Sequence, residues 1–541
     1  MDRPFVALAL FGAAALVVAR LTRRARRPLP PGPKPRWIVG NLFDMPSDSP
    51  WMRFAEWSEL YGEITYVEVF GQPIVILNSL SACKELLEKR GATSSGRPIG
   101  IMHELMNMHK VRAGLTSMQD DPFWRYERRL THAAFGPQSV QEYYPIQEAQ
   151  SVRFLQKLLE PDVNCKKELR YAIGQTLFEV AYGLSPEQYF DEFMEMSDTL
   201  LRSFLEATIP GRFLVETIPI LRYFPSWLPG AGFKRYAEGV SKVSDRHSTI
   251  YFEMVKRAWV SLHFRIAAAL MVTSLSIGTR DGSTLICVYS TNMSAQGITL
   301  VPWIAGIDTT DQTVAKFMIA MQTHPDAQRK AQEELDRVVG TERLPTIADR
   351  DNLPYLHALI KEVLRWHPGV ATGIPHRLTQ DEVYKGSYLC PQSFIPRFSQ
   401  RCRNIARQAN DGTLLTRPDE FIPERFLDTD PGFESLPDPS EIVFGFGRRI
   451  CPGRHVADGT VFLMISRLLA TYWISSPQDN NGQCTDVHID WSGVDAVRYV
   501  PMVCLQHEAH DRASYPNPMA PRFTPRSPGT IDLIKVADTM L

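Results

Sequence analysis

A glycine-rich run with a single thiol, at residues 444–453, constrains this chain more than any other stretch. It reads Phe-Gly-Phe-Gly-Arg-Arg-Ile-Cys-Pro-Gly and leads into an apolar segment with helical character. Backbone N–H groups of such a loop, and the positive end of the helix that we expect over about 453–473, lower the pKa of a thiol and stabilise a sulfur–iron bond. We interpret Cys451 as an iron ligand and Arg449 as a partner for an acidic group of a cofactor. The alternative is a buried structural cysteine, the commonest state of a lone Cys.

This run resembles the haem-binding loop of cytochromes P450, F-x-x-G-x-R-x-C-x-G, and matches it at every fixed position. The resemblance implies haem b as cofactor, with Cys451 as its axial ligand and with Phe444 and Arg449 beside it. It covers most of residues 28–505 and is closest to fungal microsomal P450s of secondary and xenobiotic metabolism.

A second motif lies about 140 residues before Cys451 and reads Ala-Gly-Ile-Asp-Thr-Thr at 305–310. Gly306 leaves room for a diatomic ligand near the backbone, Thr309 lies on the same helix face, and Asp308 can pass protons from solvent. The alternative is a common capping sequence. The motif resembles the acid–alcohol motif of the central P450 helix, which implies catalytic roles for Asp308 and Thr309.

Three charged residues are expected to form a structural network. Glu362 and Arg365 are three residues apart on one predicted helix, a spacing that alone indicates an exposed pair of little energetic weight. Arg425 belongs to a Pro-Glu-Arg-Phe run at 423–426. In P450s the corresponding three residues form a buried triad near the haem, so the resemblance implies that they hold the cysteine loop.

Partners for the haem propionates are implied by two further likenesses. Trp124 and Arg128 match the family's W-x-x-x-R helix, which offers an indole N–H and a guanidinium to a propionate. The alternative is a basic amphipathic helix, because Arg125 and Arg129 flank the pair. Arg377 stands where the family places another propionate partner.

Substrate contacts are expected from two apolar stretches. Residues 97–118 would form a variable loop over the haem and include Ile101, Met102, Met106 and Met108, while residues 370–374 would line the other side. Methionines and aliphatic side chains indicate a pliable apolar pocket, although they are equally common in a plain core. We therefore expect a small apolar substrate and leave its identity open.

The N-terminus predicts a membrane anchor. Residues 5–19 are all apolar or glycine, and five arginines follow by position 27. With its flanking residues the run approaches the lower limit of about 17 residues for a membrane span, and the arginines behind it favour a cytosolic body. We expect a single-pass anchor in the endoplasmic reticulum membrane. The alternative is a cleaved signal peptide, which normally carries its positive charge before the apolar run.

Composition is that of an ordinary enzyme and gives no reason to expect nucleic acid as a partner. The 541 residues include 59 basic and 60 acidic ones, and the eight cysteines are scattered, as is typical of reduced thiols. Runs at 64–70 and 73–77 predict a β-hairpin, and 326–339 and 354–366 predict helices.

The resemblance implies a mainly α fold with a small β region, the triangular helical prism of cytochromes P450. We divide the chain into an anchor with its basic flank (1–27), a proline-rich hinge (28–35), a haem-binding catalytic domain (36–505) and a proline-rich tail (506–541) that we expect to be loosely held.

Two stretches depart from the family pattern. Residues 385–418 lack an expected aromatic and histidine segment, and residues 260–303 replace an acidic loop and half of the central helix by an apolar run rich in Ser and Thr. Pro302 predicts that the central helix either begins there or is kinked there. We hypothesise that both stretches derive from retained intron or misassigned exon sequence. A transcript that encodes them in full would refute this hypothesis.

These features together predict a membrane-anchored haem-thiolate monooxygenase that takes electrons from NADPH-cytochrome P450 reductase. One alternative is a haem-thiolate isomerase or peroxygenase, which needs no proton relay and is disfavoured by the Asp308–Thr309 pair. The other is a degenerate or misassigned paralogue whose altered 385–418 segment impairs haem binding.

Overall fold

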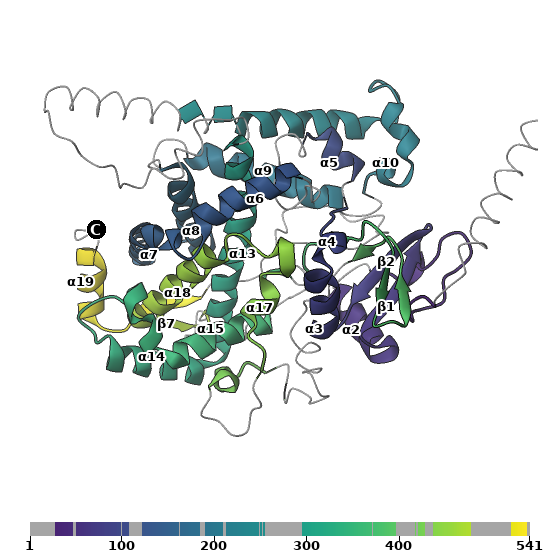
Figure 1. The fold of residues 1–541 in the computed structure, drawn as a ribbon. Helices are drawn as coiled ribbons and strands as arrows, with labels where there is room; N and C mark the ends of the chain where they lie inside the picture. Colours follow the sequence, from purple (N-terminus) through teal and green to yellow (C-terminus); the bar gives the residue numbers. More distant parts are fainter. Residues whose placement is uncertain are drawn as a thin grey trace, which may run out of the picture.

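A large helical part and a smaller sheet-containing part lie side by side (Figure 1). The computed structural model describes residues 28–46, 50–98, 100–107, 122–161, 163–183, 190–208, 212–247, 249–250, 253–254, 295–370, 372–395, 417, 420–427, 436–477 and 521–537, with only the backbone over 295–304. The predicted anchor at 1–27 lies outside these residues. Among the described helices, none has the length and apolar character to span a bilayer.

Helices dominate the described chain. They are α2 (Pro50–Tyr61), α3 (Leu80–Cys83), α4 (Gly91–Ser94), α5 (Ile101–Leu105), α6 (Pro122–Phe135), α7 (Tyr144–Lys157), α8 (Cys165–Tyr182), α9 (Phe190–Thr208), α10 (Leu214–Thr217), α13 (Ala295–Thr323), α14 (Pro325–Val338), α15 (Pro354–Trp366), α17 (Ser440–Val443), α18 (Arg454–Thr471) and α19 (Pro528–Ala537). The helices predicted over 326–339 and 354–366 are thereby confirmed as α14 and α15.

The main core forms around α13, which runs through the middle of the helical part (Figure 1). It packs against α8, α9, α15 and α18. Its residues 310–321 are buried on every side, which explains why they show no amphipathic pattern. The described part of the helix runs from Ala295 through Pro302, so the first of the two predicted alternatives, a start at Pro302, is wrong, and the second, a kink at Pro302, stays a prediction.

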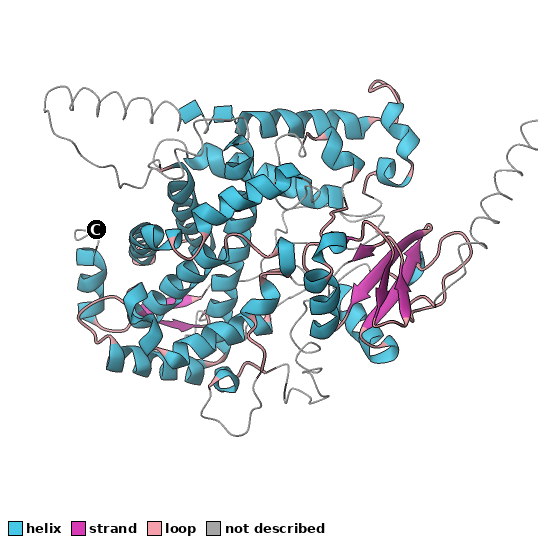
Figure 2. Cartoon of the chain, in the orientation of Figure 1, coloured by secondary structure: helices cyan, strands magenta, loops and turns pink. Residues whose placement is uncertain are grey.

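The predicted hairpin is confirmed. β1 (Ile64–Val69) and β2 (Gln72–Leu77) pair antiparallel, with Ile64 opposite Leu77. The two turn residues, Phe70 and Gly71, have φ of 49° and 79°, as tight hairpins require. Figure 2 shows the sheet that β1 and β2 form with β6 (Phe394–Ile395) and β3 (His376–Arg377), in the order β1-β2-β6-β3.

The first part of the atypical 385–418 stretch belongs to these small sheets. β5 (Tyr388–Cys390) pairs with β4 (Glu382–Tyr384), and β6 pairs with both β2 and β3. Residues 396–416 and 418 of this stretch and 260–294 of the other atypical stretch lie outside the described residues.

The expectation of a loosely held C-terminal tail is wrong for residues 521–537. β8 (Arg522–Pro525) pairs antiparallel with β7 (Tyr472–Ser475), and α19 packs against α7 and α18. Arg526 forms an ion pair with Asp336 of α14 at 2.6 Å, and Gln156 of α7 donates to the carbonyl oxygen of Ile534 at 3.2 Å. Residues 521–537 are therefore part of the helical body.

Candidate functional site

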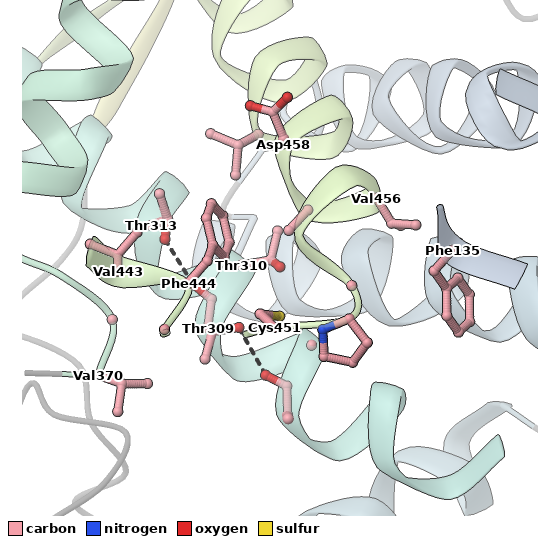
Figure 3. Close-up of a pocket in the computed structure, with 18 of the residues that line it drawn as sticks. Phe135, Thr309, Thr310, Thr313, Val370, Val443, Phe444, Cys451, Val456 and Asp458 are labelled. Atoms are coloured by element: carbon pink, nitrogen blue, oxygen red, sulfur yellow. Dashed lines mark hydrogen bonds between the residues drawn. The ribbon is translucent and has the colours of Figure 1, made fainter. Parts of the chain in front are cut away.

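Cys451 lies in a loop between α17 and α18 whose path depends on two glycines. Gly445 and Gly447 have φ of 93° and 53°. A Cβ atom on Gly447 would lie 2.3 Å from the carbonyl oxygen of Leu87, so a side chain does not fit there. The Cys451 N–H donates to the carbonyl oxygen of Phe444 at 2.6 Å and closes the loop. The loop thus presents Cys451 and Phe444 to a mainly apolar cavity (Figure 3).

The expected lowering of the Cys451 pKa is wrong for the polypeptide alone. Burial is the largest effect, and it raises the pKa of the thiol. The Gly453 N–H and the charges of Arg128 and Arg454 act in the opposite direction but do not outweigh it. A metal ion on the sulfur reverses this balance, because its positive charge favours the thiolate.

α13 brings Gly306 and Thr309 to the same cavity. Both line it together with Thr313, and Figure 3 shows Thr309 and Thr313 along the helix. The Thr309 hydroxyl donates to the carbonyl oxygen of Ala305 at 2.8 Å. A Cβ atom on Gly306 would lie 3.0 Å from Cδ1 of Leu177, so this glycine also lets α8 approach α13 closely.

Asp308 lies outside the described cavity lining, in an ion-pair cluster with α8 and α9. Arg170 of α8 donates to Asp308, to Asp311 at 3.1 Å and to Asp198 of α9. Burial raises the pKa of Asp308, while the charge and hydrogen bond of Arg170 lower it and the charge of Asp198 raises it. The predicted acid–alcohol pair is therefore divided between two environments, since only Thr309 faces the cavity.

Arg449 lines the cavity and is held from two sides. Its Nε donates to the carbonyl oxygen of Ser95 at 2.8 Å, and its Cζ lies 4.1 Å from the centre of the Trp124 ring. Trp124 is 2% exposed and is not among the described residues that line the cavity. Trp124 therefore packs against the guanidinium of Arg449, and its predicted contact with a cofactor carboxylate stays a prediction.

Two more arginines reach the cavity. Arg128 lines it, as expected, and donates to the carbonyl oxygen of Ile450 in the cysteine loop. Arg97 lines it as well, is 5% exposed, and donates to the carbonyl oxygens of Ile374 at 2.7 Å and Pro375 at 2.5 Å. Sequence reasoning treated Arg97 only as the start of a variable loop, because no motif marks a buried arginine.

The assignment of Arg377 to the cavity is wrong by one residue. Consecutive side chains of a strand face opposite sides, and in β3 the buried one belongs to His376. His376 lines the cavity, with its Nδ1 2.9 Å from the carbonyl oxygen of Ser94, whereas Arg377 is exposed. His376 therefore replaces Arg377 as a candidate partner for a cofactor.

The expected triad of Glu362, Arg365 and Arg425 is present and buried. Glu362 accepts from Arg365 Nε at 2.5 Å and from Arg425 Nε at 3.1 Å. It also accepts from the N–H of Ile422 at 2.7 Å, and Arg365 donates to the carbonyl oxygen of Glu420 at 3.0 Å. The network therefore joins α15 to the segment that contains Arg425, and the side chains of its three charged residues are buried.

Of the two stretches that we expected to contact the substrate, the second lines the cavity and the described methionines of the first do not. Val370 and Ile374 line the cavity. Met102 and Met106 are fully buried in a separate hydrophobic cluster that includes residues of α9, so they serve as core. Met108 lies outside the described residues.

A sequence model of the cytochrome P450 family matches residues 30–487. The chain belongs to this family. It resembles the cytochrome P450 monooxygenase COX1 of Coprinopsis cinerea, at 36% identity over 90% of this chain and 92% of the relative. It also resembles the tryptamine 4-monooxygenase of Psilocybe cyanescens, at 34% identity over 89% of this chain and 93% of the relative. With relatives of this kind, the protein is a fungal-type cytochrome P450 monooxygenase.

The mainly helical P450 fold is confirmed by a solved structure. A zebra fish cytochrome P450 with progesterone superposes with a TM-score of 0.62 and covers 88% of this chain and 99% of its own. Because its sequence identity is 20%, this likeness shows that the fold is shared and carries no further conclusion.

The cavity suits the haem that membership of the P450 family implies. Haem needs an axial ligand, apolar walls for the macrocycle and donors for its carboxylates. The Cys451 thiol, the side chains of Phe444, Leu177 and Val443, and the cationic groups of the arginines that line the cavity supply these three requirements. The donor set therefore fits an acidic, otherwise apolar cofactor.

Proposed function

We propose that this P450 binds haem b through Cys451 and inserts one oxygen atom from O2 into a small apolar substrate, with electrons from NADPH-cytochrome P450 reductase. The observation that carries the proposal is a single cavity lined by the Cys451 thiol and by Gly306 and Thr309 of α13. Haem, when bound, supplies the activation of dioxygen, which thiolate ligation favours.

Several polar residues of the cavity have distinct parts in holding the cofactor. Cys451 would hold the iron through its sulfur. Arg97, Arg128 and Arg449 provide guanidinium groups, which suit carboxylates because they donate in a planar fork, and His376 adds a ring nitrogen. Trp124 holds the Arg449 guanidinium in place through a cation–π contact with its ring. We assign the Glu362–Arg365–Arg425 network to holding the chain that precedes the cysteine loop.

Protons reach the cavity through two residues of α13. The cluster around Arg170 touches solvent at Asp198, whose side chain is 42% exposed. Once Asp308 has taken up a proton from solvent by way of the cluster, a turn of its carboxyl away from Arg170 lets it donate to the neighbouring Thr309. The Thr309 hydroxyl then gives up its bond to the Ala305 carbonyl, and Oγ1 accepts the proton of Asp308 as it passes its own proton to a group in the cavity.

Two observations support this function over the alternatives. A haem-thiolate isomerase or peroxygenase does not need delivered protons, so a threonine in the cavity beside a partly buried aspartate favours a monooxygenase. The degenerate-paralogue alternative predicts a disrupted haem cavity, whereas the described cavity retains a complete set of donors.

Exposed apolar side chains support a membrane location. One group lies at α10 and in the chain that follows it and includes Leu214, Ile220, Tyr223 and Trp227. A second group, near the start of the described chain, includes Trp37. Such groups are typical of surfaces that meet a partner or a bilayer. We propose a single-pass anchor at 1–27 in the endoplasmic reticulum membrane, with the catalytic domain in the cytosol.

Reconstitution with separate electron sources tests the proposed function. The purified protein is incubated with tryptamine and a panel of apolar compounds, with reductase and NADPH, with hydrogen peroxide, or without an electron source. We expect an oxygenated product only with reductase and NADPH together. A product formed without them would favour a peroxygenase or isomerase, and failure to incorporate haem would favour the degenerate paralogue.

A further inference from the structure

α13 carries a lysine in its buried middle. Lys316 is 1% exposed and is surrounded in the sequence by the core residues Val314, Ala315, Phe317 and Met318. Removing an ammonium group from water is costly unless it gains hydrogen bonds or an opposite charge. An apolar side chain would fill the same space without this cost. The contacts of the ammonium group therefore indicate what the lysine does there.

The ammonium group contacts the wall of the cavity. Nζ of Lys316 donates to the carbonyl oxygen of Pro368 at 3.2 Å. Pro368 directly precedes Gly369 and Val370, and both of these line the cavity. The lysine thereby links the buried core of α13 to the chain that limits the space for a substrate.

The same helix meets this chain at a second point. A Cβ atom on Gly369 would lie 3.4 Å from the carbonyl oxygen of Thr309 and 3.7 Å from its Cα and Cβ, so Gly369 lies against Thr309. Lys316 is seven residues after Thr309, which places it on nearly the same helix face about 10 Å further along. The segment 368–370 is therefore positioned between a backbone contact at Thr309 and a hydrogen bond at Lys316.

We propose that Lys316 is a positioning residue that determines substrate specificity, because it sets how far Gly369 and Val370 extend into the cavity. This inference rests on the proposed function, since it concerns the substrate side of the same site. Without the ammonium group, the Pro368 carbonyl loses a donor and the segment is free to relax away from α13. The space beside Val370 then changes. Bulky molecules that reach Val370 therefore bind with a different affinity, whereas molecules too small to reach it are unaffected.

The test compares Lys316→Met with the unchanged protein, using imidazole as a small iron-binding probe and 4-phenylimidazole as a bulky one. We expect the ratio of the two dissociation constants to change by about 2- to 10-fold, as for the loss of one hydrogen bond. The ferrous carbon monoxide spectrum should remain unchanged. Lys316→Gln keeps a shorter donor and covers the case in which Lys316→Met does not fold, with a change of ratio in the same direction.

Met318→Leu provides the matched control. Met318 is fully buried on the same helix, two residues from Lys316 and therefore on nearly the opposite face, and its sulfur lies 3.8 Å from that of Cys165 in α8. We expect this variant to keep the original ratio. An unchanged ratio in both Lys316 variants, or an equal change in Met318→Leu, would overturn the inference. Failure of the proposed function differs, because the unchanged protein would then lack the thiolate spectrum itself.

Discussion

The guanidinium carbon of Arg449 lies 4.1 Å from the centre of the Trp124 ring, which joins α6 to the cysteine loop. We predict that Trp124→Leu releases haem about 2- to 30-fold faster, because the guanidinium loses a cation–π contact. Transfer of haem to excess apomyoglobin measures this rate. Tyr126→Leu is the matched control, since Tyr126 is an exposed aromatic on the same helix with Arg129 6.0 Å from its ring. Equal rates for the two variants would contradict the supporting role of Trp124.

The buried triad predicts a large loss of stability when one partner is removed. Arg425→Met leaves the Glu362 carboxylate with fewer donors in a buried site, so we expect a loss of about 3–5 kcal/mol in the free energy of unfolding. Urea unfolding followed by tryptophan fluorescence measures it. Arg329→Met removes an exposed ion pair with Asp326 and should cost less than about 1 kcal/mol. Similar losses in both variants would show that the triad contributes no more to the free energy of unfolding than an exposed ion pair does.

Asp308 predicts a selective loss of oxygen chemistry. Asp308→Asn should lower NADPH-supported turnover by about 10²–10⁴-fold, the usual contribution of a positioned proton donor. Haem content and the carbon monoxide spectrum should not change, because Asp308 lies outside the described cavity lining. Asp326→Asn, at an exposed position on α14, should keep full turnover. If Asp308→Asn also keeps full NADPH-supported turnover, protons must reach the cavity by another route, and the proposed role of Asp308 is wrong.

His103 predicts a loss of stability toward acid pH. Burial in α5, against the ring of Phe204, lowers the pKa of His103 to about 4 from its ordinary 6.5. His103 therefore becomes protonated below about pH 6.5 in the unfolded chain, but only below about pH 4 in the folded protein. The stability that His103 contributes is complete above the upper value and is lost as the pH falls through this window.

We accordingly expect His103→Leu to unfold with less pH dependence than the unchanged protein. Between pH 6.5 and 4, the free energy of unfolding should fall by about 3 kcal/mol more in the unchanged protein than in His103→Leu. Urea unfolding at each pH measures this difference. His132→Leu, which also removes an imidazole but at an exposed position on α6, is the control variant. Parallel slopes for His103→Leu and the unchanged protein would refute the prediction.

The parts of the site that are local in sequence were predictable. The cysteine loop is defined by glycines and by a thiol within ten residues, and its positive φ values at Gly445 and Gly447 follow from that pattern. The triad joins residues 63 positions apart and was predictable only through the family likeness. The hairpin was also predictable from its two β-rich runs, but its turn lies at Phe70 and Gly71, one residue before the predicted Gly71 and Gln72.

The errors concern contacts between distant segments and the balance of opposing effects. Arg170 and Asp308 are 138 positions apart, and no local pattern indicates that they meet. A shift of one residue in β3 exchanges His376 for Arg377, because strand side chains alternate. The C-terminal strand β8 is short and contains Pro525, so its pairing with β7 is set by tertiary contacts. The direction of the Cys451 pKa required knowledge of its burial.

The reduced, carbon monoxide-bound absorption spectrum tests most directly whether Cys451 holds haem as a thiolate. We predict that the purified protein shows the long-wavelength Soret band characteristic of thiolate ligation, and that Cys451→His shows the shorter-wavelength band typical of a nitrogen ligand. A short-wavelength band in the unchanged protein, or a long-wavelength band that survives in Cys451→His, would contradict the assignment of Cys451 as the axial ligand.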